Sequence, residues 1–203
     1  MQTIWRRIET WMAANTDGDL ALRPGAPASE LTALEGEMGI KLPDDLRESF
    51  LIHDGQEMPS VRWFDGERRL HPLASIADQW RFDSSETDMP EGLTGDERAR
   101  IAMSHRGRLP LIGVRFWDGD NVYADFIPGP AGRAGQILYR MDVELDVIAN
   151  DWRSFLGEYA RKLEAGELVY KQGVALYPDA KGCIVVPGAD LTYGSDVFAS
   201  FRP

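Results

Sequence analysis

The alternation of apolar and polar positions over residues 27–56 predicts two short amphipathic helices that meet at an elbow. Leu31, Leu34 and Met38 share one face of the first helix, because residues three and four positions apart are neighbours on a helix. Gly39 ends that helix, since glycine readily adopts the left-handed conformation found at helix C-termini. The rest of the predicted fold is arranged around this helix pair.

Residues with known preferences at helix ends set the predicted boundaries. Ser29 is the expected N-cap of the first helix, because its hydroxyl can accept a hydrogen bond from a backbone N–H of the first turn. Pro43 suits the first turn of the second helix, where its missing N–H costs nothing, and Asp44 lies at the positive end of the helix dipole. Leu46 and Phe50 then form the buried stripe.

Similar patterns predict a helix at each end of a sheet. Residues 4–12 carry apolar side chains at helical spacing, and this helix should end near Ala14. Residues 109–149 alternate short apolar runs with turns, and such short links favour antiparallel strands. The fold class is therefore α+β, a mainly antiparallel sheet with packed helices. A last helix, capped by Asn150 or Asp151, carries a nearly complete i, i+3, i+4 stripe. The stripe comprises Trp152, Phe155, Leu156, Tyr159, Ala160 and Leu163.

Between the helix pair and the sheet, the chain carries a turn, a short helix and an acidic stretch. Asp65-Gly66 predicts a hairpin, and residues 75–80 predict a short helix. Residues 83–97 contain six acidic side chains and no basic one. This stretch is interpreted as an acidic loop, either a solvated insert or a loop that contacts a partner.

The predicted domain covers residues 1–166, with Gly166 as the end of the last helix. Residues 167–203 form a C-terminal extension, in which short apolar runs alternate with Gly and Pro. These runs predict either strands added to the sheet edge or an arm that packs on a second subunit. The second arrangement would make a homodimer.

Composition indicates a globular protein of the cytoplasm. Of the 203 residues, 43% are hydrophobic, which argues against a disordered chain. No apolar run approaches the ~20 residues of a membrane span, and the N-terminal residues lack the features of a signal peptide. Cys183 is alone, so no internal disulfide is expected, which fits a reducing compartment.

The formal net charge of −11 bears on the choice of partner. An acidic surface repels nucleic acid and anionic membranes, and it attracts proteins with a basic surface. Solubility alone is the simpler explanation of the same charge. The sequence therefore predicts no nucleic-acid or membrane partner, and it leaves a basic protein partner open.

The sequence predicts no catalytic site, metal or cofactor. His53, His71 and His105 form no pair with metal-ligand spacing. The glycine-rich loop over residues 129–135 lacks Gly-Lys-Ser/Thr and precedes a strand, whereas a phosphate-binding loop precedes a helix. Carboxylates at residues 118–125 are better explained by turn chemistry and a structural hydrogen bond than by acid–base catalysis.

Two blocks of the sequence resemble the SUKH superfamily, of the cell-wall-assembly-regulator type. The first runs from Gly39-Ile40-Lys41-Leu42-Pro43 through His53-Asp54-Gly55. The second runs from Leu109-Pro110-Leu111-Ile112-Gly113 through Asp125 and the glycine-rich loop to the last helix. The resemblance covers roughly residues 1–166.

This resemblance implies a non-catalytic protein-binding module. Bacterial members are implied to be immunity proteins, which bind and neutralise a cognate toxin, and this is the first hypothesis for the chain. The alternative is a regulatory scaffold without a toxin partner, as the fungal members imply. Trp63, Trp80 and Trp117 are candidates as interface anchors or as core residues. The acidic residues are candidates for contacts with a basic partner. The predicted partner-binding residues are Trp63, Asp83, Glu86, Asp88, Glu91, Trp117, Asp118, Asp120 and Asp125.

Overall fold

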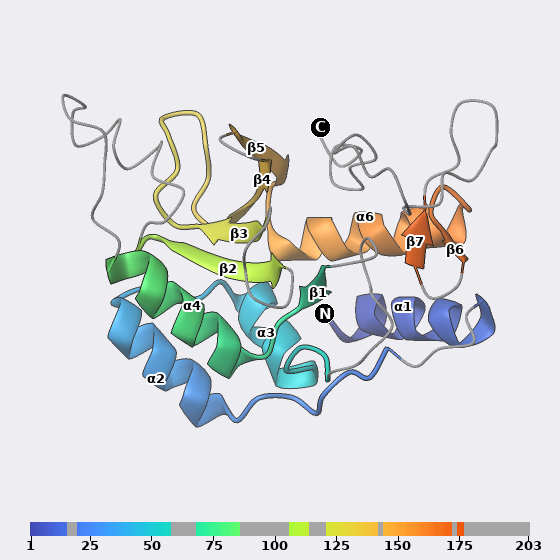
Figure 1. Cartoon of the computed structure of the whole chain (residues 1–203), viewed down its shortest axis with the longest axis horizontal. Helices are drawn as coiled ribbons and strands as arrows, with labels where there is room; N and C mark the ends of the chain where they lie inside the picture. The colour runs from blue at the N-terminus through green and yellow to red at the C-terminus, as the bar shows by residue number, and fades with distance from the viewer. Residues whose placement is uncertain are drawn as a thin grey trace.

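The computed structural model describes residues 1–15, 20–57, 68–85, 106–113, 121–141, 144–171 and 174–176. Its helices and strands are arranged as Figure 1 shows. The helices are α1 (Gln2–Asn15), α2 (Ala28–Met38), α3 (Asp44–Ile52), α4 (Leu73–Ser85) and α6 (Trp152–Glu164). The strands are β1 (Arg69–Leu70), β2 (Arg108–Gly113), β3 (Val122–Asp125), β4 (Gln136–Met141), β5 (Glu144–Ala149), β6 (Val169–Lys171) and β7 (Val174–Leu176).

Strands β1 to β5 form one sheet in the order of the sequence, and every neighbouring pair is antiparallel. Each strand therefore lies beside the next strand along the chain, as the short links predict. Strands β6 and β7 form a separate antiparallel pair. The α+β fold with a mainly antiparallel sheet is confirmed.

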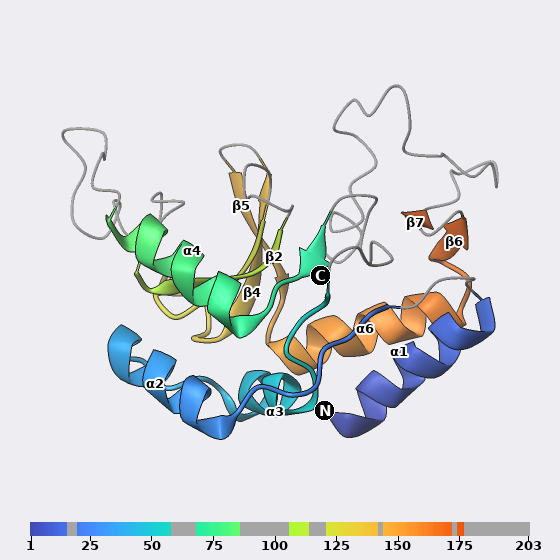
Figure 2. The same ribbon diagram turned by 60° about the horizontal axis from the view of Figure 1, so that its bottom comes forward.

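The helices cover the sheet in two layers. Helices α4 and α6 contact its strands, while α2 packs on α4, and α1 and α3 pack on α6. Figure 2 shows α2, α3 and α1 following one another along the side of the molecule away from the sheet. The layers share one hydrophobic core, to which the sheet contributes Leu109, Leu111, Val122, Ala124, Ile137 and Tyr139.

The apolar stripe of α6 is confirmed, since all six predicted residues are buried. Asp151 is the N-cap, and its carboxylate accepts a hydrogen bond from the backbone N–H of Ser154 at 2.7 Å. Gly166 follows the helix with a φ of +70°. None of the helices in the described parts of the chain is long and apolar enough to cross a membrane.

The elbow is confirmed in outline, and two details of its helix ends are wrong. Gly39 is the left-handed C-cap of α2, with a φ of 67°. Ser29 is not the N-cap: the N-cap position is Pro27, two residues before Ser29, and no side chain caps the helix. Pro43 precedes α3 as its N-cap residue, since its extended backbone (ψ 148°) is not helical.

One other element differs from the prediction. Helix α4 continues to Ser85, so the predicted acidic loop cannot begin at residue 83. In the extension, β6 pairs with β7, and the two predicted arrangements of residues 167–203 stay predictions. The predicted hairpin at Asp65-Gly66 lies outside the described residues, and the division of the chain at residue 166 stays a prediction.

Candidate protein-binding surface

A buried carboxylate holds the elbow between α2 and α3. Glu35, which is 5% exposed, accepts the backbone N–H of Leu42 at 3.0 Å. Its other oxygen accepts a hydrogen bond from Arg47 Nη1 at 2.9 Å and lies 3.5 Å from Lys41 Nζ. These partners satisfy a charge that burial would otherwise make costly, and they lock the two helices at a defined angle.

Replacing Glu35 by glutamine should destabilise the protein by about 2 kcal/mol, because Arg47 loses its charged acceptor while the side-chain shape is kept. Urea denaturation measures the free energy of unfolding. Glu30→Gln on the exposed first turn of the same helix is the matched control and should cost only a few tenths of a kcal/mol. Equal effects of the two substitutions would contradict the structural role of Glu35.

A second polar junction ties the helix pair to the sheet. Asp54 accepts the backbone N–H of Leu73 at 2.7 Å, and Arg23 Nε donates to its other oxygen at 3.2 Å. Gln56 accepts the backbone N–H of Leu70 at 3.2 Å. The segment after α3 is therefore fixed both to the start of α4 and to strand β1.

Of the predicted partner-binding residues, Asp125 is placed inside the sheet. It is 2% exposed and lies between Arg108 and Gln136 on the neighbouring strands. Gln136 Nε2 donates to it at 2.9 Å, and Arg108 Nε lies 3.5 Å from its other oxygen. Burial lowers the pKa of Arg108, and the charge of Asp125 opposes that shift. Asp125 thus makes structural hydrogen bonds, one of the two roles considered, and contact with a partner stays a prediction.

Asp83 is also buried, at 5% exposure, and it belongs to α4. Gln79, one turn earlier, donates a hydrogen bond to its carboxylate at 2.7 Å. The assignment of Asp83 to a loop is therefore wrong. The sequence suggested a loop because Asp83 is the first residue of the acidic stretch. Its position on the helix face follows instead from its spacing from Gln79 and Trp80.

The other predicted partner-binding residues lie outside the described residues, so their roles stay predictions. They are Trp63, Glu86, Asp88, Glu91, Trp117, Asp118 and Asp120.

The charge of the described residues is nearly balanced. They carry 16 Lys and Arg against 18 Asp and Glu, a net charge of −2, whereas the whole chain carries −11. Most of the acidic surplus that was predicted to attract a basic partner therefore belongs to segments outside the described residues.

The histidines that the structure describes have hydrogen-bond partners. His53 Nε2 lies 2.6 Å from Glu9 Oε1, and its ring packs edge-on against Trp5, so it joins the end of α3 to α1. His71 Nε2 lies 3.0 Å from the carbonyl oxygen of Gly113. Within the described ranges, no group of three or more His, Cys, Asp or Glu side chains is arranged to hold a metal ion.

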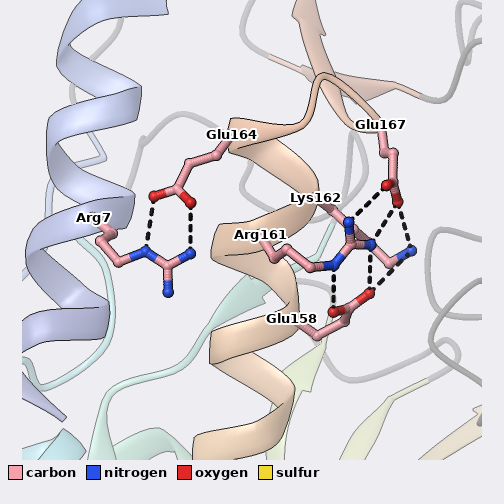
Figure 3. A network of polar contacts seen from close by, with 6 residues as sticks. All are labelled: Arg7, Glu158, Arg161, Lys162, Glu164 and Glu167. Atoms are coloured by element: carbon pink, nitrogen blue, oxygen red, sulfur yellow. Dashed lines mark hydrogen bonds and ion pairs between the residues drawn. The ribbon is translucent and has the colours of Figure 1, made fainter.

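Ion pairs line the surface where α1 and α6 run side by side (Figure 3). Arg7 of α1 donates from Nε and Nη2 to the two carboxylate oxygens of Glu164 at 2.8 and 2.6 Å. This hydrogen bonding raises the pKa of Arg7 and lowers the pKa of Glu164. No local pattern in the sequence predicts this pair, because 157 positions separate its members.

A second group of charges covers the end of α6. Arg161 makes two hydrogen bonds to Glu158 and two to Glu167, all at 2.7 Å. Lys162 lies within 3.5 Å of the same two carboxylates. Glu167 is the first residue after the turn at Gly166, so the network ties the start of the C-terminal extension to α6.

The hydrogen bonds from Arg161 lower the pKa of Glu167 from 4.5 to about 2. A carboxylate whose pKa falls on folding stabilises the protein above the unfolded-state value, and this contribution is lost as the pH drops from 4.5 to about 2. A carboxyl NMR titration should therefore give a midpoint near 2 for Glu167. Arg161→Gln should raise that midpoint, while Arg153→Gln at the other end of α6 should leave it unchanged. A midpoint of 4 or more in the unsubstituted protein would disprove the network.

An open groove runs along α1 beside the Arg7–Glu164 pair. Its apolar surface comes from Trp11, and Thr3 and Thr10 add hydroxyl groups. Arg6, Arg7 and Glu164 supply its charges. The structure thus brings together α1 and the C-terminal end of α6 in a surface that no sequence motif indicated.

Comparison with known proteins assigns residues 25–158 to the SMI1 / KNR4 family (SUKH-1). The chain belongs to this family. The resemblance inferred from the elbow and the second sequence block is confirmed. The SMI1/KNR4 segment begins before α2 and ends within α6, so it contains the five-stranded sheet and the two polar junctions at Glu35 and Asp54.

Three relatives show how this SMI1/KNR4 chain compares with longer proteins. It is 30% identical over 189 residues to the cell wall biosynthesis/cell cycle regulator smi1 of Schizosaccharomyces pombe, a match that covers 80% of this chain and 36% of that protein. It is 29% identical over 204 residues to the glucan synthesis regulatory protein of Neurospora crassa, covering 80% and 38%. It is 24% identical over 204 residues to the cell wall assembly regulator SMI1 of Saccharomyces cerevisiae, covering 80% and 40%.

These relatives bear on the two functional hypotheses. The chain spans 36% to 40% of their length, so their activities as whole proteins do not transfer directly. All three are fungal, and their names describe regulators of wall or glucan assembly. They favour the regulatory alternative over the immunity hypothesis and give no support to a bacterial origin.

Proposed function

We propose that this chain is a non-catalytic protein-binding module with a regulatory role. The observation that supports the proposal most is the match of 80% of the chain to proteins named as regulators of cell wall assembly and glucan synthesis. The chain would act by holding a partner protein, and the partner would carry the chemistry. The proposal concerns this SMI1/KNR4 segment only.

The buried carboxylates join neighbouring elements of the fold, as expected for a rigid scaffold. The carboxylates of Glu35, Asp54 and Asp125 each accept hydrogen bonds from neighbouring elements of the fold. Such satisfied networks hold elements rigidly, and a rigid surface loses little entropy on binding a partner. The outer helix layer of α1, α2 and α3 is the surface that this scaffold presents away from the sheet (Figure 2).

Affinity purification of the tagged full chain from its native cells tests the proposal. We expect a small set of stoichiometric partners by mass spectrometry, and increased sensitivity of gene-deleted cells to wall-degrading enzymes. The destabilised variant Gly55→Ala should retain less of the specific partners and serves as the control for non-specific capture. No retained partner together with unchanged sensitivity would overturn the regulatory role. A single partner with a toxin domain would instead favour the immunity hypothesis.

A further inference from the structure

Helix α1 and the C-terminal end of α6 meet outside the SMI1/KNR4 segment. Helix α1 precedes residue 25, and the last residues of α6 follow residue 158, so neither belongs to the matched range. Both views show α1 and α6 side by side, with β6 and β7 at the end of α6 that lies away from the sheet (Figures 1 and 2). The groove lined by Trp11, Arg6 and Glu164 therefore lies beyond the family segment.

The charges of this groove are not balanced. Arg6 is exposed and has no carboxylate within ion-pair distance among the residues that the structure describes. Glu164 occupies Nε and Nη2 of Arg7, and Figure 3 shows Nη1 of Arg7 pointing away from that carboxylate. Two arginines thus face a single carboxylate. By contrast, Arg81 on α4 and Arg161 on α6 are each matched by two carboxylates.

The pair with Glu164 also prepares Arg7 for binding. A guanidinium held by two hydrogen bonds has already lost much of its rotamer freedom, so a further acceptor at Nη1 costs less entropy. Trp11 lies one helical turn from Arg7, is packed in part against the core, and exposes the remainder to the groove. Tryptophan and arginine are both enriched among the interface residues that dominate binding energy.

We infer that this groove binds an acidic peptide segment of a partner protein. A partner carboxylate would accept hydrogen bonds from Arg6 and from Nη1 of Arg7, and an adjacent apolar side chain would pack on Trp11. The excess of arginine in the groove favours an acidic peptide, and the open shape of the groove along α1 admits an extended or a helical segment. The inference rests on the proposed protein-binding function and names the surface and the partner chemistry.

NMR of the ¹⁵N-labelled full chain tests the inference with a defined probe. The probe is a short synthetic peptide in which glutamate and leucine alternate, and its control carries lysine in place of every glutamate. We expect the acidic peptide to shift the amide signals of Thr3, Arg6 and Thr10 and the indole signal of Trp11. The lysine peptide should leave them in place. Shifts confined to another face, or equal binding of both peptides, would overturn the inference.

Charge reversal separates the groove from the rest of the surface. Arg6→Glu should weaken binding of the acidic peptide by at least about tenfold, as expected for loss of a charge-assisted contact and its replacement by repulsion. Arg133→Glu makes the same change of charge on the glycine-rich loop and should leave the affinity unchanged. Arg6→Glu should also bind the lysine peptide more tightly than the unsubstituted chain does. Equal weakening by both substitutions would show a non-specific charge effect and overturn the inference.

Two further outcomes concern the occupant and the proposed function. If the chain is a dimer that the acidic peptide dissociates, as seen by sedimentation, the occupant is a second copy and the inference fails. If native partners are captured equally by the unsubstituted chain and by Arg6→Glu, the inference fails while the protein-binding function stands. If no native partner is captured but the acidic peptide binds at Arg6 and Trp11, the proposed function fails and the binding site stands.

Discussion

Gly55→Ala should destabilise the protein by at least about 3 kcal/mol. Gly55 has a φ of +70°, and an added Cβ would lie 2.5 Å from the carbonyl carbon of His71 and from the nitrogen of Pro72. These are backbone atoms, and the segment that carries them is fixed by the hydrogen bonds of Asp54 to Leu73 and of Gln56 to Leu70. Neither strand β1 nor the start of α4 can move away without breaking them. Guanidinium denaturation followed by circular dichroism measures the loss.

Gly39 provides the matched control for this substitution. Its φ of +67° is nearly the same, but an added Cβ would meet nothing within 4 Å. Gly39→Ala should therefore cost only about 1 kcal/mol, the conformational price of a left-handed residue. Asparagine tolerates this conformation, so Gly39→Asn should recover part of the loss, while Gly55→Asn should recover none because its Cβ meets the same backbone. Equal costs at the two glycines would disprove the close contact at Gly55.

Trp5→Ala should destabilise the protein by about 3–5 kcal/mol, the usual range for loss of a large aromatic side chain from a core. Trp5 is fully buried, its ring contacts that of His53, and its Nε1 donates a hydrogen bond to Ser49 Oγ at 3.0 Å. The substitution leaves a cavity between α1 and α3 and removes the donor to a buried hydroxyl. Urea denaturation with unchanged slope would identify the effect as lost stability of the native state.

Two variants of α1 make the test of Trp5 specific. Trp5→Phe keeps much of the volume and should cost less than Trp5→Ala, although Ser49 still loses its partner. Arg6→Ala, on the exposed face of the same helix, should change stability by less than about 0.5 kcal/mol. A loss below about 1 kcal/mol for Trp5→Ala would mean that α1 contributes little to the fold, and that result would count against α1 as a rigid wall of the proposed groove.

The contacts of α1 with α3 bear on where the domain of this SMI1/KNR4 chain begins. The family segment begins at residue 25, yet Trp5 and His53 join α1 to α3 inside that segment. A domain that starts before residue 25, as the sequence analysis expects, is consistent with these contacts. The surface that we infer to bind an acidic peptide would thus be part of the folded unit, although it lies outside residues 25–158, the range that the family model matches.

Local sequence patterns predicted the elements well where short-range physics decides them. The stripe on α6 follows from helical spacing, and the end of α2 follows from the tolerance of Gly39 for a positive φ. The predicted start of α2 was wrong. Ser29 has the right chemistry for an N-cap, but the chain enters the helix two residues earlier, after Pro27. Helix ends are decided by how the preceding chain packs as well as by the local residues.

The sequence by itself determined the α+β class, the antiparallel order of the sheet and the family, because periodicity, turn residues and two motif blocks are local properties. The tertiary structure alone decided which polar residues meet. Asp83, which was predicted to lie in a loop, is buried on a helix, and the buried Asp125 makes the structural hydrogen bonds that were one of its two predicted roles. Arg7 and Glu164, far apart in the chain, form one surface. Long-range pairs of this kind depend on how helices pack, and in a single sequence each member is an ordinary charged residue on a helix face.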